Sequence, residues 1–223
     1  MTAISQAIHT LQGSLPKGVD LVAVSKFHPV EALMGAYNAG QRIFGESRAQ
    51  ELIKKVPEMP DDVEWHFIGH LQTNKVKSII PIVSLIHSID SEKLLRTVDE
   101  EAGKAGRIVD VLLELHVAQE ESKFGFTPED CLRLAGDGTF ASLKNVRIRG
   151  VMGMATNTED EAEIAKEFHA IRAVFDTLKQ GAMSANPEFS IVSMGMSDDY
   201  EIAIAEGSTM VRVGSKIFGP RQY

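Results

Sequence analysis

A lysine follows directly on an apolar run near the start of the chain. The stretch from Leu21 to Lys26 reads LVAVSK, and a strand over it would place Val22, Val24 and Lys26 on one face. An amine that shares a face with two valines loses part of its hydration, which lowers its pKa and frees it as a nucleophile toward carbonyl carbons. The alternative is a lysine at a strand end whose amine simply reaches water. The first interpretation predicts a covalent carbonyl site at Lys26.

Two stretches near the C-terminus could bind a phosphate. They read SMGMSDDYE from Ser193 and VRVGSK from Val211. Gly195 and Gly214 permit close backbone approach, and Ser197 and Ser215 supply hydroxyl donors. The alternative is a pair of ordinary glycine turns.

An arginine and several histidines could also contribute to a site. Arg212, if it faces inward, needs a carboxylate, a phosphate or a ring nitrogen as its partner, and a structural ion pair is the common solution. His66 could stack on a flat ligand or be a hydrogen-bonded core histidine. A zinc site of His66, His87 and His116 is conceivable, but no spaced pattern of His, Asp and Glu supports it, so we expect no metal.

The elements that must position these residues alternate regularly along the chain. Short apolar runs rich in β-branched residues, typical of strands covered on both faces, are separated by segments of helical periodicity. The runs begin at Leu21, Arg42, Trp65, Leu85, Val109, Val146, Phe189 and Thr209. Eight such units without a GxGxxG motif favour a closed barrel over an open doubly wound sheet. We therefore expect an α/β protein, a single-domain (β/α)8 TIM barrel over residues 1–223, with the polar strand ends gathered at its mouth.

Several residues predict where helices begin. Ser91 and Thr127 are candidate N-caps, and Asp198 with Glu201 resembles a capping box at the start of DDYEIAIAEG.

Composition and charge exclude several classes of function. The chain has 223 residues with 23 Lys and Arg against 31 Asp and Glu, a net charge of −8, so we expect no nucleic-acid partner. Cys131 is the only cysteine, and neither a secretory signal nor a membrane-length apolar run is present. We expect a cytoplasmic protein with no membrane partner.

Taken together, the motifs resemble the YggS/PROSC family of pyridoxal phosphate homeostasis proteins. The resemblance runs from about Leu21 to Arg221, with the motifs in the family's order. The stretches that carry it are LVAVSK, FGESRAQE, WHFIGHLQTNK, HSIDS, EESKFGF, RGVMGMAT and SMGMSDDYEIAIAEGSTMVRVGSKIFGPR.

The resemblance implies a barrel like the N-terminal domain of alanine racemase, and a Schiff base between Lys26 and pyridoxal 5'-phosphate (PLP). It also implies that the phosphate is held by Ser197, Gly214 and Ser215. Arg212 would face the pyridine nitrogen, and the ring would lie between His66 and Met196.

Two positions depart from the family pattern. Ser47 replaces an asparagine that many members carry near the cofactor, and His116 stands where many have asparagine. The shorter Ser47 puts a direct hydrogen bond to the ring substituents in doubt.

Two functions remain open at this point, and a third, a metal-dependent barrel hydrolase, stays open only if Lys26 has no role. One is a PLP-binding protein that buffers the cofactor or supplies it to PLP-dependent apo-enzymes, without robust catalysis and as a monomer. The other is an amino-acid racemase, which needs an acid–base group on each face of the cofactor plane. Lys26 could serve one face, and Tyr200 is the candidate for the other, since Tyr37 falls on the apolar stripe of a predicted helix. We expect the binding protein.

Overall fold

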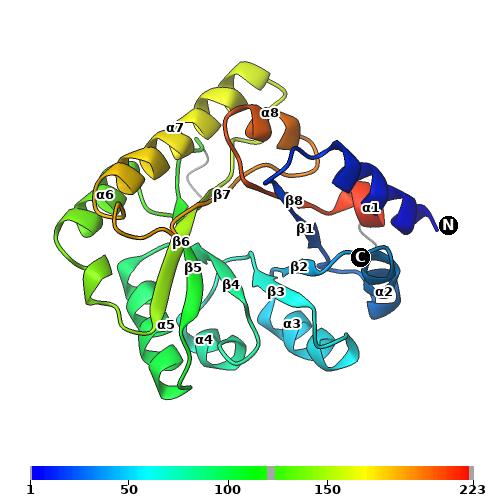
Figure 1. Ribbon diagram of the computed structural model, residues 1–223, viewed down its shortest axis with the longest axis horizontal. Coiled ribbons are helices and arrows are strands. Elements are labelled where there is room, and N and C mark those ends of the chain that lie inside the picture. Colours follow the sequence, from blue (N-terminus) through cyan, green and yellow to red (C-terminus); the bar gives the residue numbers. More distant parts are fainter. Residues whose placement is uncertain (1, 120–123, 221–223) are drawn as a thin grey trace.

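Eight parallel strands close into a barrel in chain order in the computed structural model of the chain (Figure 1). The strands are β1 (Asp20–Val24), β2 (Ile43–Glu46), β3 (Glu64–Phe67), β4 (Leu85–Ile89), β5 (Val109–Leu115), β6 (Val146–Gly153), β7 (Ile191–Ser193) and β8 (Met210–Val213). Pairing of β1 with β8, which sets Val22 beside Arg212, closes the ring. The structure describes residues 2–119 and 124–220, so Glu120 to Lys123 of the EESKFGF motif and Arg221 lie outside it. The predicted α/β barrel is confirmed.

Helices surround the barrel and cover its outer face (Figure 1). The α-helices are α1 (Ala3–Ser14), α2 (Val30–Asn38), α3 (Ala49–Lys55), α4 (Thr73–Ile79), α5 (Glu92–Lys104), α6 (Pro128–Gly136), α7 (Glu161–Gln180), α8 (Tyr200–Ala205) and α9 (Ser215–Phe218). In the described ranges, the connections also contain the 3-10 turns η1 (Val56–Glu58) and η2 (Phe140–Ser142).

The strands are shorter than their apolar runs predicted. The first run was expected to continue to Lys26, but β1 ends at Val24. The seventh was expected to begin at Phe189, yet β7 spans only Ile191–Ser193. At the C-terminal ends, the polar residues lie beyond the paired part of the strands and form the loops of the barrel mouth. Lys26 is therefore a loop residue, two positions beyond its strand.

Side chains on the two faces of the strands form separate apolar clusters. Inside the barrel lie Val22, Leu85, Leu112, Met152 and Met210. The opposite faces of the strands pack against the helices in the main core, as Ala23 and Leu113 do. This alternation places every second residue of a strand inside the barrel, and the residues nearest the C-terminal ends reach its mouth.

The helix starts confirm two of the three predicted caps. The hydroxyl of Ser91 accepts a hydrogen bond from the Leu94 amide, and that of Thr127 accepts one from the Asp130 amide. The predicted capping box of Asp198 and Glu201 is wrong. Helix α8 begins one residue later, with Asp199 as its N-cap and no side-chain cap bond.

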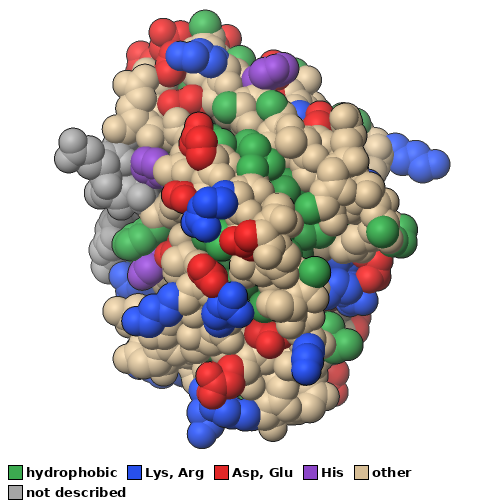
Figure 2. Space-filling view, turned by 90° about the vertical axis from the view of Figure 1, so that its left-hand side faces the viewer, with side chains coloured by type: hydrophobic (Ala, Val, Ile, Leu, Met, Phe, Trp, Pro, Cys, Tyr) green, Lys and Arg blue, Asp and Glu red, His purple; other side chains and the backbone are tan. Residues whose placement is uncertain are grey.

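The surface agrees with the mixed charge of the sequence. On the face that Figure 2 shows, lysine and arginine side chains lie among aspartates and glutamates rather than in a patch of one sign. Among the described residues, no helix combines the length and the apolar character needed to cross a membrane.

Candidate functional site

A cavity of about 490 Å³ opens at the C-terminal ends of the strands. This mouth cavity has the size of a small-molecule site. Among the residues predicted from the sequence, those that line it are Lys26, Ser47, Met196, Ser197, Arg212, Gly214 and Ser215. Residues separated by almost the whole chain thus meet in one hollow, because all follow or end strands of the same barrel.

The backbone on both sides of Lys26 is tied down. Ser25 is buried, and its hydroxyl donates to Oε1 of Glu46 over 2.6 Å. On the other side, the Phe27 amide donates to Oε2 of Glu51 over 2.9 Å. Phe27 has a φ of 67°, a left-handed conformation that a side chain with a Cβ adopts only at a cost. These bonds hold a sharp turn that presents the half-buried Lys26 to the cavity.

A second lysine supports the same turn from below. Nζ of Lys55 donates to the Ser25 carbonyl over 2.9 Å and pairs with Oε1 of Glu46 at 2.6 Å. Burial raises the pKa of Glu46, while the charge of Lys55 opposes that shift. The amine of Lys55 is thus committed to structure.

The loops after β7 and β8 form the predicted phosphate region. The Gly214 amide donates to Oγ of Ser197 over 3.2 Å, so the two loops are joined. Because this hydroxyl accepts from Gly214, its own proton remains for a ligand. A Cβ on Gly214 would lie 3.3 Å from the Val24 carbonyl oxygen, so a side chain here would crowd the end of β1. Ser215 follows as an exposed residue on the cavity wall.

Arg212 lies inside the barrel with its guanidinium at the cavity floor. It donates to the carbonyl and hydroxyl oxygens of Ser193, each over 2.7 Å, and to the Gly153 carbonyl over 3.0 Å. Burial lowers its pKa to about 10, so the group remains charged at neutral pH. In the part of the chain that the structure describes, it forms no ion pair, so the common structural explanation does not apply. Its hydrogen bonds to described residues go only to neutral oxygens, and the carboxylates of Asp199 and Glu114 act on it without forming an ion pair, so the cation favours an anionic or lone-pair ligand.

A hydrogen-bond chain continues from Arg212 into the barrel interior. Nδ1 of His87 lies 3.0 Å from Oγ of Ser193, and Nε2 of His87 lies 3.0 Å from Nδ1 of His66. Arginine can only donate, so Ser193 accepts from it and has its own proton for His87. His87 then donates to His66. Burial lowers the pKa of both histidines, that of His66 to about 3, so both are neutral.

His66 therefore takes part in the hydrogen bonding of the barrel interior. It is buried at 3% exposure and is not part of the mouth cavity lining, so its predicted position beside a ligand ring has no support in this geometry. His116 also lies outside the lining. Within the described ranges, no three His, Cys, Asp or Glu side chains gather as a metal site.

Ser47 and Met196 both line the mouth cavity. Met196 is 39% exposed on the cavity wall, which suits a side chain that packs on a ligand ring. Ser47 lies against Gly69, where a Cβ would stand 2.4 Å from the Ser47 carbonyl oxygen. This close approach fixes the loop after β2 beside the loop after β3.

The racemase alternative needs a second base, and Tyr200 is poorly placed for it. The side chain is buried, its hydroxyl lies 3.0 Å from Oε1 of Glu201, and it does not line the mouth cavity. Burial raises its pKa further above the ordinary value. The hydroxyl of Tyr37 bonds Asp62, away from the cavity.

A buried acid that lines the cavity went unnoticed in the sequence. Glu114 of β5 lines the mouth cavity at 4% exposure. The signal was present, because alternation from Leu112, which lies inside the barrel, puts Glu114 on the same inner face. His28 and His70 also line the cavity from loops whose course the sequence pattern did not specify.

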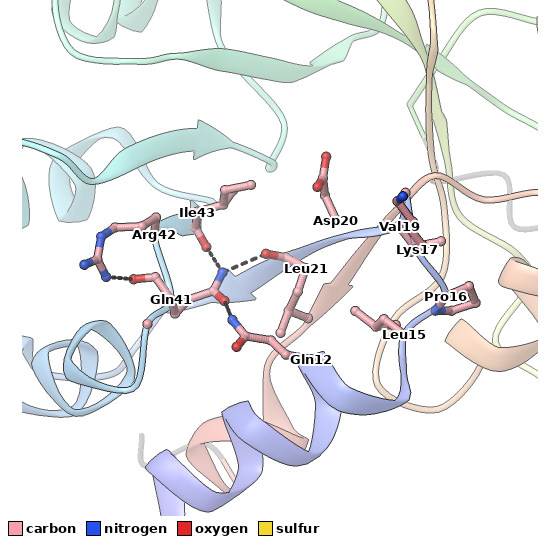
Figure 3. A pocket seen from close by; sticks show the side chains of 12 residues that line it. Gln12, Leu15, Pro16, Lys17, Val19, Asp20, Leu21, Gln41, Arg42 and Ile43 are labelled. Atoms are coloured by element: carbon pink, nitrogen blue, oxygen red, sulfur yellow. Dashed lines mark hydrogen bonds between the residues drawn. The ribbon is translucent and has the colours of Figure 1, made fainter.

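A second hollow, of about 390 Å³, lies at the opposite end of the barrel, where β1 and β2 begin (Figure 3). Its amide groups bond one another and the backbone. Nε2 of Gln41 donates to the Leu21 and Ile43 carbonyls, each over 2.7 Å, and Nε2 of Gln12 donates to Oε1 of Gln41 (Figure 3). These polar groups serve the packing of α1 on the barrel rather than a ligand.

The fold and the mouth cavity define the class of protein. The family model of the alanine racemase N-terminal domain matches residues 1–222. The chain is thus a barrel of that class, with a lysine after its first strand and a donor cluster after its last two.

Similarity to curated proteins identifies the family within this class. The chain is 41% identical over 204 residues to the pyridoxal phosphate homeostasis protein of Aquifex aeolicus, covering 91% of this chain and 87% of that one. It is 42% identical over 216 residues to the protein of the same name from Schizosaccharomyces pombe, covering 94% and 87%. The chain belongs to the family of pyridoxal phosphate homeostasis proteins.

A solved structure agrees with this assignment. PipY of Synechococcus elongatus without PLP superimposes with a TM-score of 0.91 at 38% identity, covering 97% of this chain and all of PipY. The structure of PipY with PLP bound gives a TM-score of 0.86 at 37% identity and the same coverage.

Proposed function

We propose that this protein binds PLP in the mouth cavity and serves PLP homeostasis by buffering the cofactor or supplying it. The observation that carries the proposal is the meeting of Lys26, Arg212, Ser197 and Ser215 in one cavity. An amine, a buried guanidinium and two hydroxyls match the aldehyde, the ring nitrogen and the phosphate of one small molecule. The PLP-bound structure of the relative PipY supports the same ligand.

Each residue has a distinct part in holding the ligand. Lys26 binds the aldehyde covalently from a turn that Glu46, Glu51 and Lys55 keep rigid. Ser197, Ser215 and the backbone at Gly214 hold the phosphate, and Met196 packs on the ring. Ser47 is too short for the contact that an asparagine would make, and a water takes its place.

Arg212 is the partner of the pyridine nitrogen in this proposal. When bound, PLP supplies an aldehyde that captures amines and a ring that withdraws electrons. A charged guanidinium disfavours protonation of the ring nitrogen, and an unprotonated ring is a weaker electron sink. The arrangement therefore retains the cofactor while limiting its chemistry.

Binding without robust catalysis is the expected outcome. The mouth cavity offers Lys26 on one side, and Tyr200, the candidate second base, lies outside its lining. Loss of a positioned acid–base group removes roughly 10²–10⁴-fold in rate. We infer that the whole chain works as one domain and as a cytoplasmic monomer, with PLP-dependent apo-enzymes as recipients.

The direct test is borohydride reduction of the protein loaded with PLP, followed by peptide mass mapping. A phosphopyridoxyl group should be found on Lys26 and should be absent from Lys55, whose amine is committed to Glu46 and Ser25. A Lys26→Ala variant should lose the visible absorbance of the bound aldehyde. Labelling of another lysine with Lys26 unmodified would overturn the assignment.

A further inference from the structure

Glu114 is a buried acid in the mouth cavity to which neither the sequence motifs nor the proposed contacts give a role. It lies near the C-terminal end of β5, beside Met152 of β6. Only 4% of the residue is exposed, and its Oε2 has no hydrogen-bond partner. A buried carboxyl oxygen left unsatisfied costs about 1–3 kcal/mol or more. A ligand in the cavity can supply the missing partner.

The charged groups around Glu114 do not compensate for the cost of burying its carboxylate. Asp90, after β4, repels a second negative charge, whereas Arg212 of β8 attracts one. Burial is the largest effect, and together with Asp90 it outweighs Arg212 and raises the pKa of Glu114 to about 7. The buried His87 of β4 is neutral, and β6 contributes uncharged methionines. The other titratable groups on the cavity wall are Lys26, His28, His70 and Asp198.

An incoming PLP molecule changes this balance in one direction. It brings an anionic phosphate and displaces water from the cavity, and both effects disfavour a carboxylate. A neutral carboxylic acid, by contrast, can donate a hydrogen bond to an acceptor atom of the ligand.

We propose that Glu114 is a PLP-binding residue that acts as the neutral acid and donates a hydrogen bond to an acceptor atom of the ligand. The inference rests on the proposed PLP site and adds a residue to it. Binding above neutral pH then takes up a proton on Glu114, and affinity falls as the pH rises.

The test uses pyridoxine 5'-phosphate, which lacks the aldehyde and so removes the pH dependence of the Lys26 reaction. Its affinity is measured by calorimetry from about pH 6.5, just below neutrality, to about pH 9, for the full chain and for Glu114→Gln, in buffers of different ionisation enthalpy. Glu64→Gln, an exposed position at the start of β3, is the matched control. The buffer comparison reports protons taken up on binding.

The expected result is a loss of affinity that approaches about tenfold per pH unit above neutrality, together with proton uptake, for the unmodified chain and the control. Glu114→Gln keeps a hydrogen-bond donor without titrating, so its profile should be flatter and its proton uptake smaller. If affinity depends on pH in the same way in the unmodified chain and in Glu114→Gln, the proposal is overturned. Two other results would also overturn it: affinity that rises with pH in the unmodified chain but not in Glu114→Gln, or complete loss of binding in Glu114→Gln. Each means that the ligand needs the carboxylate.

The same experiment separates failure of the proposed function from failure of the role of Glu114. If the unmodified chain binds neither PLP nor pyridoxine 5'-phosphate at any pH, the site itself is wrong. If Glu114→Gln and Glu64→Gln both bind PLP with the same proton uptake, the site stands and only the role of Glu114 is refuted.

Discussion

The amide of Gly214 donates to the hydroxyl of Ser197 over 3.2 Å, and this bond joins the loops that follow the last two strands of the barrel. The bond orients the hydroxyl oxygen toward the backbone and leaves its proton for a ligand. Ser215, the next residue on the β8 side, adds a second hydroxyl to the cavity wall.

Replacing both hydroxyls should weaken PLP binding strongly. A hydrogen bond to a charged phosphate contributes about 1.5–3 kcal/mol, so each of Ser197→Ala and Ser215→Ala should cost roughly ten- to a hundredfold in affinity. Pyridoxal without its phosphate should bind the unmodified protein weakly for the same reason. Equilibrium titration of the visible absorbance measures both effects. Ser78→Ala, at an exposed position on α4, is the control, and equal affinity for the two aldehydes would contradict the phosphate site.

Amino acids should not be turned over efficiently, and Tyr200 should not matter to whatever exchange occurs. Its hydroxyl bonds Glu201 outside the cavity lining. The PLP-loaded protein is incubated with single enantiomers of alanine or serine in deuterated water. Slow exchange of the α-hydrogen with retained configuration fits a single base, Lys26, and should persist in Tyr200→Phe. Rapid inversion over many turnovers that disappears in Tyr200→Phe would make the protein a racemase.

Stability should depend on the backbone of Gly195. This residue has a φ of +92°, and a Cβ on it would lie 2.6 Å from Cβ of Ala203 and 2.9 Å from Cα of Tyr200. Gly195→Ala should therefore lower the free energy of unfolding by about 1–3 kcal/mol, measured by urea denaturation. Gly136→Ala is the contrast, because a Cβ on this exposed residue of α6 meets nothing within 4 Å. That substitution should be neutral or stabilise by up to about 1 kcal/mol, and equal losses for the two would refute the steric argument.

Acid should destabilise the protein through His66. Burial holds the pKa of His66 at about 3, against an ordinary value of 6.5, so the unfolded chain binds a proton that the folded chain does not. The stability from this histidine is complete above the ordinary value and is lost as the pH falls below it. The slope is about 1.4 kcal/mol per pH unit, so roughly 2 kcal/mol should disappear by about pH 5. Urea unfolding of His66→Gln should show a shallower loss, while the exposed His9→Gln should follow the unmodified protein. Parallel curves for His66→Gln and the unmodified protein would contradict the prediction.

The local signals in the sequence were sufficient for the architecture. Eight apolar runs without a dinucleotide-binding motif specified the barrel, and the hydroxyls of Ser91 and Thr127 marked helix starts that the structure confirms. The capping box at Asp198 failed because Asp199 begins the helix instead, with its carboxylate bonded to the Met196 amide. Competing caps in adjacent positions differ too little in energy for sequence patterns to separate them.

By itself, the sequence determined which strands exist and which polar residues lie near or beyond their C-terminal ends, so Lys26, Ser197, Arg212 and Ser215 could be placed at one mouth. The tertiary structure decided how deep each side chain lies and what it bonds. A period of two residues assigns a face but not a depth: His66 is buried and does not line the cavity, whereas Glu114 does. His87 and Ser193 are 106 residues apart in the chain, yet their hydrogen bond helps to set the place of Arg212. Such contacts arise only when the barrel closes, because ring closure brings strands that are distant in sequence within hydrogen-bonding distance.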